Sequence, residues 1–244
     1  VADVGGHEMA GAKALRIPES GGFVSLYQSH RGGIFSVHLA TSTNLLDWTW
    51  RVQLADQASM PTILPASDGG YAVAWEQEPD NHLLFAYYPS WSDLLAGIPS
   101  KTLEPPQQLS DCAEGTPNLY AASSTFLDVG FHFYDDCDTD RQAHGTSDWT
   151  SFTAAPRRDI EDAVRANDVE AGVGDRDVVE IGGIELTLVE GMARRDDWRT
   201  WDIYLYDDIT KAAEPLVFRT HAGSTAFTNP TAAIVDLAGR PTLV

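Results

Sequence analysis

The sequence predicts an all-β fold, a five-bladed β-propeller whose antiparallel blades contain three or four strands each. Three observations predict it. A segment of about fifty residues repeats five times, most repeats continue into runs rich in aromatic and β-branched residues, and glycine-containing turns precede two of those runs. This spacing is typical of propeller blades. Because 43% of the 244 residues are hydrophobic, the chain can bury the core of one such domain over residues 1–244.

Each repeat begins with a similar short segment. Residues 60–63, 116–119 and 229–232 each place a proline second, and divergent copies occupy residues 13–15 and 177–179. We expect these segments to form the innermost strands of the blades. The expected inner strands start near Lys13, Pro61, Pro117, Asp177 and Pro230.

Further strands follow each inner strand. The predicted second strands are residues 23–27, 71–75, 129–133 and 185–189, and the predicted third strands are residues 34–40, 83–88, 141–146 and 201–206. The fifth repeat reaches only its second strand at Val244, so its outer strands would come from the N-terminal residues or from outside this sequence. One short surface helix is predicted over residues 159–167, where Ile160, Ala163 and Val164 recur at helical spacing.

A polar cluster with a tryptophan or leucine recurs after the third strands, in residues 42–48, 90–94 and 146–149. We interpret it as a capped turn whose aromatic residue packs between neighbouring blades. Stacking of the aromatic ring against a ligand is the alternative.

The charge of the chain limits its partners. There are 16 Lys and Arg against 36 Asp and Glu, a net charge of -20 that repels nucleic acid and anionic membrane surfaces. No apolar run is long enough to span a bilayer, and the sequence starts without the basic-then-apolar pattern of a signal peptide. We therefore expect a mature, secreted, extracellular protein, a monomer that binds neither nucleic acid nor membrane.

The chain has two cysteines, Cys112 and Cys137. They are too few for a zinc cage of thiolates and too far apart for a C-x-x-C redox pair. We expect one disulfide, which suits an oxidising compartment; two reduced thiols in the core are the alternative.

The turns of the type Ser-x-Asn/Asp-Leu-x-x-Trp, the five repeats and the proline at the start of the first strands together resemble the five-bladed propeller glycoside hydrolases, family 43 and its relatives. The resemblance implies that the strand openings point into an axial pocket, where acidic residues act as general base, pKa-tuning carboxylate and general acid. Residues 114–117, Glu-Gly-Thr-Pro, are similar to the acid-bearing opening of the third blade. The first repeat departs from the family, because residues 7–11 replace its usual Asp-Pro.

Three carboxylates are the predicted catalytic residues. Glycoside hydrolysis needs one carboxylic acid to protonate the leaving oxygen and a second carboxylate to activate water or attack the sugar. Glu114 is the preferred general acid, with a cap-like carboxylate that accepts backbone hydrogen bonds from Thr116 and Asn118 as the alternative. Asp175 or Asp177 would be the base or the pKa modulator, unless both belong to a structural network with Arg176 between blades.

Other residues are candidates for contact with substrate. Glu76 and Glu190 stand at corresponding ends of second strands, which indicates a shared role, either contact with ligand or hydrogen bonding between blades. His132 is more often an inter-blade histidine than a base in this position. The predicted substrate-binding residues are Glu8, Trp75, Glu76, Asn118, Arg176, Glu190 and Asn229.

We expect no cofactor and no catalytic metal. Residues 135–140 alternate acids as a calcium loop does, but they lack the glycine and the distal glutamate of an EF-hand, so we interpret them as a solvated acidic loop, with a structural calcium ion as the alternative. No serine or cysteine nucleophile motif, phosphate loop or dinucleotide fingerprint occurs. The sequence therefore predicts a glycoside hydrolase that acts on a polysaccharide or oligosaccharide. The alternatives are a lectin-like propeller that binds carbohydrate without turnover and a structural propeller with an empty axis.

Overall fold

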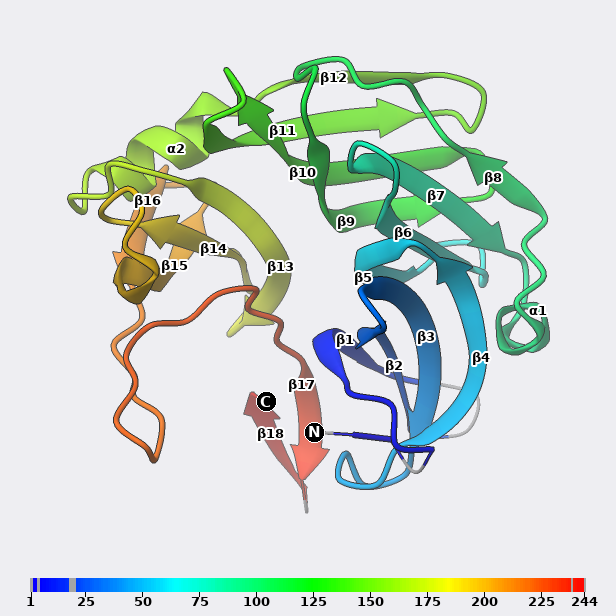
Figure 1. The fold of residues 1–244 in the computed structure, drawn as a ribbon. Coiled ribbons are helices and arrows are strands. Elements are labelled where there is room, and N and C mark those ends of the chain that lie inside the picture. The colour runs from blue at the N-terminus through cyan, green and yellow to red at the C-terminus, as the bar shows by residue number, and fades with distance from the viewer. Residues whose placement is uncertain (1, 4, 18–20, 238, 244) are drawn as a thin grey trace.

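Antiparallel four-stranded sheets follow one another around a central axis (Figure 1). The structure, a computed structural model, describes residues 2–3, 5–17, 21–237 and 239–243, and it does not describe the side chains of residues 175, 235, 237 and 241–243. Within each sheet the strands lie side by side in chain order, so each sheet is one up-and-down blade with its first strand innermost. The all-β propeller fold with antiparallel blades is confirmed.

The first two blades follow the predicted pattern of strands. The first blade contains β1 (Ala10–Arg16), β2 (Phe23–Arg31), β3 (Ile34–Ser42) and β4 (Thr49–Asp56). The second contains β5 (Ala58–Pro65), β6 (Tyr71–Gln77), β7 (His82–Tyr88) and β8 (Lys101–Leu103), with the helix α1 (Trp91–Ala96) before its last strand.

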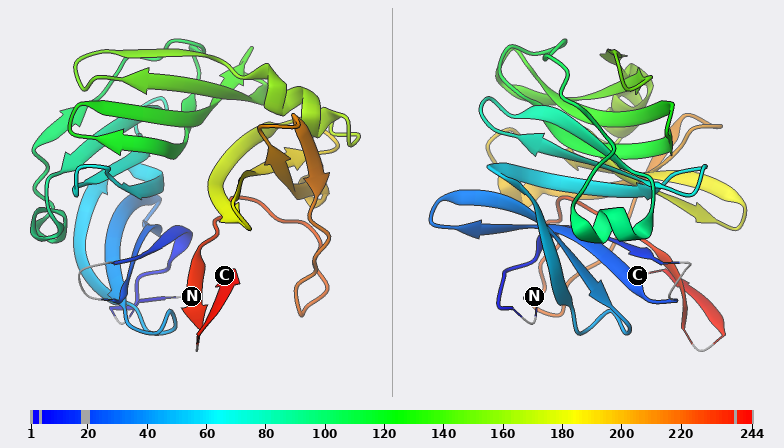
Figure 2. Two further views of the ribbon diagram at one scale, coloured as in Figure 1. Left: turned by 180° about the vertical axis from the view of Figure 1, so that it is seen from behind. Right: turned by 90° about the vertical axis from the view of Figure 1, so that its right-hand side faces the viewer.

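The third and fourth blades repeat this order. The third contains β9 (Glu114–Ser123), β10 (Phe126–Asp135), β11 (Thr139–Ser147) and β12 (Phe152–Pro156). The helix α2 (Arg158–Arg165), which the sequence predicts, leads on to β13 (Val173–Ile181), β14 (Ile184–Met192), the short 3-10 helix η1 (Trp198–Thr200), β15 (Trp201–Asp207) and β16 (Ala212–Pro215). Figure 2 shows α2 on the outer rim, between these two blades.

Each inner strand opens with a β-bulge, and this explains the repeated prolines. The register with the second strand shifts near the start of β1, β5, β9 and β13. In the first three, the bulge contains a residue with positive φ, namely Gly11, Met60 and Thr116. Pro61 and Pro117 come next, where the ladder is already interrupted and the missing N–H costs little.

Hydrophobic side chains fill the spaces between the first three blades. One cluster joins the first and second blades, a second joins the second and third, and a third packs α2 against the fourth blade. Trp149 lies against Tyr87 of the preceding blade, with ring centroids 5.8 Å apart, as the capped-turn interpretation predicts. Residues 91–96 form α1 instead of a simple turn, because Ser90 caps the backbone N–H of Asp93 and allows a full helical turn.

The prediction of five blades is wrong, because the described residues form four. The fifth repeat contributes only the two-stranded sheet of β17 (Ile234–Leu237) and β18 (Arg240–Leu243), between the first and fourth blades (Figure 1). The first strand of this repeat starts at Ile234 and not at Pro230, and carboxylates of the fourth blade accept the backbone N–H groups of Asn229 and Ala232 ahead of it.

The predicted disulfide is confirmed. Cys112, just before β9, and Cys137, in the turn after β10, are bonded with Cα atoms 5.5 Å apart. The disulfide joins the segment before the inner strand of the third blade to the turn after its second strand. In the part of the chain that the structure describes, no helix is both long and apolar enough to cross a membrane.

Candidate active site

The second strands of all four blades end on the same face of the propeller, which we call the upper face. Near the end of each second strand, one side chain reaches the inner strand of the next blade or, for the fourth blade, the segment before β17. Gln28 Oε1 accepts the N–H of Met60 at 2.6 Å, and Glu190 accepts the N–H of Asn229. The four side chains are Gln28, Glu76, His132 and Glu190. The shared role predicted for Glu76 and Glu190 is therefore inter-blade contact.

Two glycines make the closest of these crossings feasible. Gly115 of β9 lies directly under the carboxylate of Glu76, and Gly174 of β13 lies under the ring of His132. A Cβ atom at either position would overlap the side chain above it. Glycine is needed here because the crossing side chain lies flat on the neighbouring backbone.

Glu76 and His132 line a pocket of about 230 Å³ on the upper face, between the second and third blades. We call it the Asp140 pocket. Its lining is polar, as a site for a hydroxyl-rich ligand requires. The lining residues are Glu76, Asn81, Ala113, Gly115, Thr116, His132, Tyr134 and Asp140.

The two carboxyl groups of this pocket have different surroundings. Burial, together with the negative charge of Glu76, raises the pKa of the Asp140 carboxyl to about 6. Glu76 accepts hydrogen bonds from the Thr116 hydroxyl at 2.6 Å and from the Ser59 hydroxyl at 3.0 Å, which stabilise a carboxylate. Asp140 is therefore suited to carry a proton near neutral pH, whereas two hydroxyl donors hold the Glu76 side chain.

Asp140 is not among the site residues predicted from the sequence. It stands at the end of the acidic stretch 135–140, which the sequence suggests is solvated, and the neighbouring Asp138 is indeed exposed and paired with Arg195. Asp140 is the second residue of β11, and the Gly172 segment of the fourth blade covers it. Only its place as an acid at the start of a third strand gave a signal in the sequence.

Glu114 lies outside this pocket. Its side chain is 2% exposed, and its Oε1 accepts the backbone N–H groups of Gln108 at 2.7 Å, of Ser110 at 3.1 Å and of Leu109. The donors differ from the Thr116 and Asn118 groups that the cap-like alternative names. The carboxylate thus holds the loop that precedes β9.

Asp177 lies in a different pocket of about 510 Å³, which the inner strands of all four blades line around the axis. It is buried and forms an ion pair with Lys13 of β1. Its other oxygen accepts the N–H of Ala232 at 2.9 Å, and Thr231 donates to the carbonyl of Ala12 at 2.9 Å. Asp177 therefore connects the fourth blade, the segment before β17 and the first blade.

Arg176 is not the partner of Asp177. It is 2% exposed, and its Nε and Nη1 atoms have no hydrogen-bond partner among the described residues. Lys13 takes the place that the predicted network gives to arginine, because both blades bring their inner strands to the axis. The side chain of Asp175 lies outside the described residues, although its backbone pairs with Val189.

The remaining predicted contacts are dispersed. Trp75 is 5% exposed in the core between the first two blades, and its Nε1 donates to Gln77 at 2.9 Å. Asn118 is fully buried in β9. Glu8 is exposed and lines a separate pocket on the first blade, beside His7 and two further histidines. Of the predicted site residues whose side chains the structure describes, Glu76 alone lines the Asp140 pocket.

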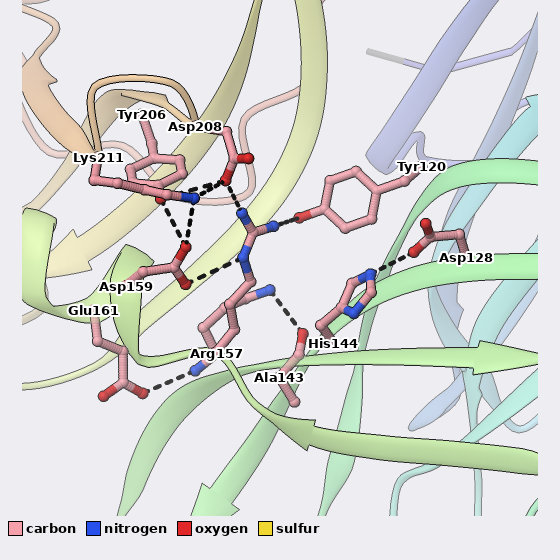
Figure 3. Close-up of polar contacts among 11 residues, drawn as sticks. Tyr120, Asp128, Ala143, His144, Arg157, Asp159, Glu161, Tyr206, Asp208 and Lys211 are labelled. Atoms are coloured by element: carbon pink, nitrogen blue, oxygen red, sulfur yellow. Dashed lines mark hydrogen bonds and ion pairs between the residues drawn. The ribbon is translucent and has the colours of Figure 1, made fainter.

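Arg157 forms a polar cluster where the third blade meets the fourth (Figure 3). Its guanidinium lies 6.0 Å from the ring centroid of Tyr120 and 5.7 Å from that of Tyr206, and it pairs with Asp159 at 3.3 Å and with Asp208. Burial opposes ionisation of Asp159, but hydrogen bonds from Tyr206 and a lysine and the charge of Arg157 lower its pKa to about 2. The charged side chains of this cluster pair with one another, and these pairs join the third blade to the fourth.

Nowhere in the described ranges do three or more His, Cys, Asp or Glu side chains gather in a group that could hold a metal ion. The absence of a cofactor and the calcium alternative at residues 135–140 stay predictions.

Solved structures resemble this fold, although no protein-family model and no curated protein matches the sequence. An endo-1,4-β-xylanase from Bacteroides thetaiotaomicron gives a TM-score of 0.65 at 12% identity, over 88% of this chain and 78% of that chain. An α-L-arabinofuranosidase from Podospora anserina, in complex with cellotriose, gives 0.56 at 12% identity, over 92% and 72%. A thermostable family-43 glycoside hydrolase gives 0.55 at 11% identity, over 88% and 78%.

This chain has the propeller fold of glycoside hydrolases. At these identities the likeness concerns the fold alone, and the chemistry has to be argued from the side chains of the Asp140 pocket.

Proposed function

We propose that the protein is a glycoside hydrolase that acts on a polysaccharide or oligosaccharide, with Asp140 as general acid and Glu76 as the partner carboxylate. One observation carries the proposal: a single pocket contains two carboxyl groups, one with its pKa raised to about 6 and one bonded to two hydroxyl donors. Two carboxyls with contrasting environments are what hydrolysis of a glycosidic bond requires.

Each group has a definite task in this proposal. Protonated Asp140 gives its proton to the glycosidic oxygen as the bond to the sugar breaks, so the leaving sugar departs as an alcohol. Glu76 either removes a proton from the water that attacks the anomeric carbon, or attacks that carbon itself to form a glycosyl ester that water then hydrolyses. His132 and Tyr134 line the same pocket and can hydrogen-bond sugar hydroxyls.

The proposal replaces the roles that the sequence suggests for Glu114 and Asp177. Both carboxylates already accept hydrogen bonds that hold the fold together, and they lie outside the Asp140 pocket. The role of Asp175 stays a prediction from sequence.

The test is a screen of aryl glycosides and polysaccharides with the purified protein, followed by two variants. Asp140→Asn should abolish turnover of natural sugars but spare aryl glycosides whose leaving group needs no proton, whereas Glu76→Gln should abolish both activities. Asp138→Asn, a change at an exposed acid two residues away, is the matched control and should keep both. Sugar binding without turnover of any substrate would contradict hydrolysis and favour the lectin-like alternative.

We also propose that the protein is secreted and monomeric. The Cys112–Cys137 disulfide supports an oxidising compartment, and the net charge of -20 supports the prediction that it binds neither nucleic acid nor anionic membranes. Light scattering coupled to gel filtration measures the molar mass in solution and tests whether the protein is a monomer.

A further inference from the structure

A tryptophan with a large exposed ring stands on the upper face of the fourth blade. Trp198 opens η1, and 73% of its surface is exposed. Its loop is held in place: Arg195 donates to Thr139 at 2.9 Å and pairs with Asp138, both in the third blade next to Asp140. The ring is therefore presented on a fixed loop beside the Asp140 pocket.

A second tryptophan lies behind the first with an unused donor. The Trp201 ring is 6.1 Å from that of Trp198, is 4% exposed, and its Nε1 has no hydrogen-bond partner within the described part of the chain. A buried N–H without an acceptor destabilises the folded state, so buried indoles usually have a partner. The missing acceptor points to a ligand or to a water that a ligand holds.

Gly172 connects this aromatic pair to the proposed acid. A side-chain carbon at Gly172 would lie 3.0 Å from Cη2 and 3.5 Å from Cζ2 of Trp201, and 3.4 Å from Cβ of Asp140. The Cη2–Cζ2 edge of the Trp201 ring and the Asp140 side chain therefore both lie on the side of Gly172 where a side chain would stand. Because residue 172 has no side chain, Trp201 and Asp140 are neighbours across that position.

We propose that Trp198 and Trp201 form a subsite for a sugar ring next to the one whose bond Asp140 cleaves. The inference rests on the proposed function. The exposed indole face of Trp198 offers an apolar surface to the C–H face of a sugar, and the Trp201 N–H offers a donor to one of its hydroxyls. The substrate class that follows is a chain of at least two sugar units, since a single sugar in the Asp140 pocket leaves this subsite unfilled.

The experiment compares short and long sugars in a Glu76→Gln background, which prevents turnover. Calorimetric titration uses xylohexaose, cellohexaose and arabinohexaose, with xylose, glucose and arabinose as the short probes. Trp198→Ala should weaken hexasaccharide binding about tenfold, and Trp201→Phe, which keeps a ring but removes the N–H, should weaken it about threefold. Monosaccharide binding should stay unchanged in both.

Trp50→Ala is the matched control. Trp50 is 41% exposed and lies on β4 of the first blade, away from Asp140, so its loss should leave hexasaccharide binding unchanged. Three results would overturn the subsite. The Trp198→Ala variant could bind hexasaccharide as tightly as the Glu76→Gln protein, it could lose no more affinity than Trp50→Ala, or the Glu76→Gln protein could bind no hexasaccharide. Hexasaccharide binding that depends on Trp198, in a protein that hydrolyses nothing, would support the subsite and overturn the proposed hydrolysis instead.

Discussion

Asp140→Asn should make the protein more stable at neutral pH while it removes the proposed activity. The carboxyl has a pKa of about 6 in the folded protein, against an ordinary value of 3.8. Above pH 6 the folded state therefore holds an ionised group that burial and Glu76 disfavour. At about 1.4 kcal/mol for each tenfold change in proton affinity, the difference corresponds to about 3 kcal/mol, an upper limit because the partly buried group retains some hydration.

The gain in stability of Asp140→Asn over the wild-type protein depends on pH. A raised carboxyl pKa favours the folded state most when the group is protonated, so the wild-type protein loses stability relative to the variant as the pH rises from about 3.8 to 6. Urea denaturation of both proteins at pH 7.5 and at pH 4 measures this. The variant should be more stable by up to about 3 kcal/mol at pH 7.5, with a much smaller gain at pH 4, and Asp138→Asn should show no such gain. An Asp140→Asn effect that is absent, or equal at both pH values, would refute the assignment.

Three further predictions concern Glu76, Glu114 and the glycine under His132. The pKa of Asp140, followed by NMR titration of its carboxyl carbon, should be lower in Glu76→Gln than in the wild-type protein, because the charge of Glu76 helps to raise it; an unchanged pKa would count against the pair. Glu114→Ala should lower the free energy of unfolding, measured in urea, by about 3 kcal/mol, because buried backbone donors lose their acceptor. A variant that loses activity at unchanged stability would instead support the catalytic role predicted from the sequence. Gly174→Ala should lower the melting temperature, because the new Cβ atom overlaps the His132 ring. Adding His132→Ala should recover part of the lost melting temperature. A double variant no more stable than Gly174→Ala would show that the two residues do not interact.

The sequence by itself determined the elements that depend on local patterns. Alternating aromatic and β-branched residues predict strands because successive side chains point to opposite faces of a sheet, and the first three strands of all four blades lie where this pattern places them. The amphipathic spacing of Ile160, Ala163 and Val164 predicts α2, and all three side chains are buried. The disulfide also follows from sequence, since the two cysteines flank one predicted hairpin.

The number of blades depended on tertiary contacts. The proline at residue 230 looks like the start of a fifth inner strand, but the strand begins at Ile234 and, among the described residues, pairs with β18 alone. Glu190 and Asp177 accept the N–H groups of Asn229 and Ala232, and Thr231 donates to the carbonyl of Ala12, so the segment ahead of β17 bridges the fourth and first blades. A local pattern cannot show which donors a distant carboxylate will take.

The candidate active site was decided in the same way. Glu76 could be nominated for contact with substrate because it recurs at one repeat position, but as catalytic acids the sequence favours Glu114, Asp175 and Asp177, which stand at strand openings. Packing separates these acids: Glu114 and Asp177 are surrounded by donors, while the cover supplied by the fourth blade raises the pKa of Asp140, an ordinary member of an acidic stretch in the sequence. Proton affinity depends on burial and on neighbouring charges from other blades, and only the tertiary structure brings those together.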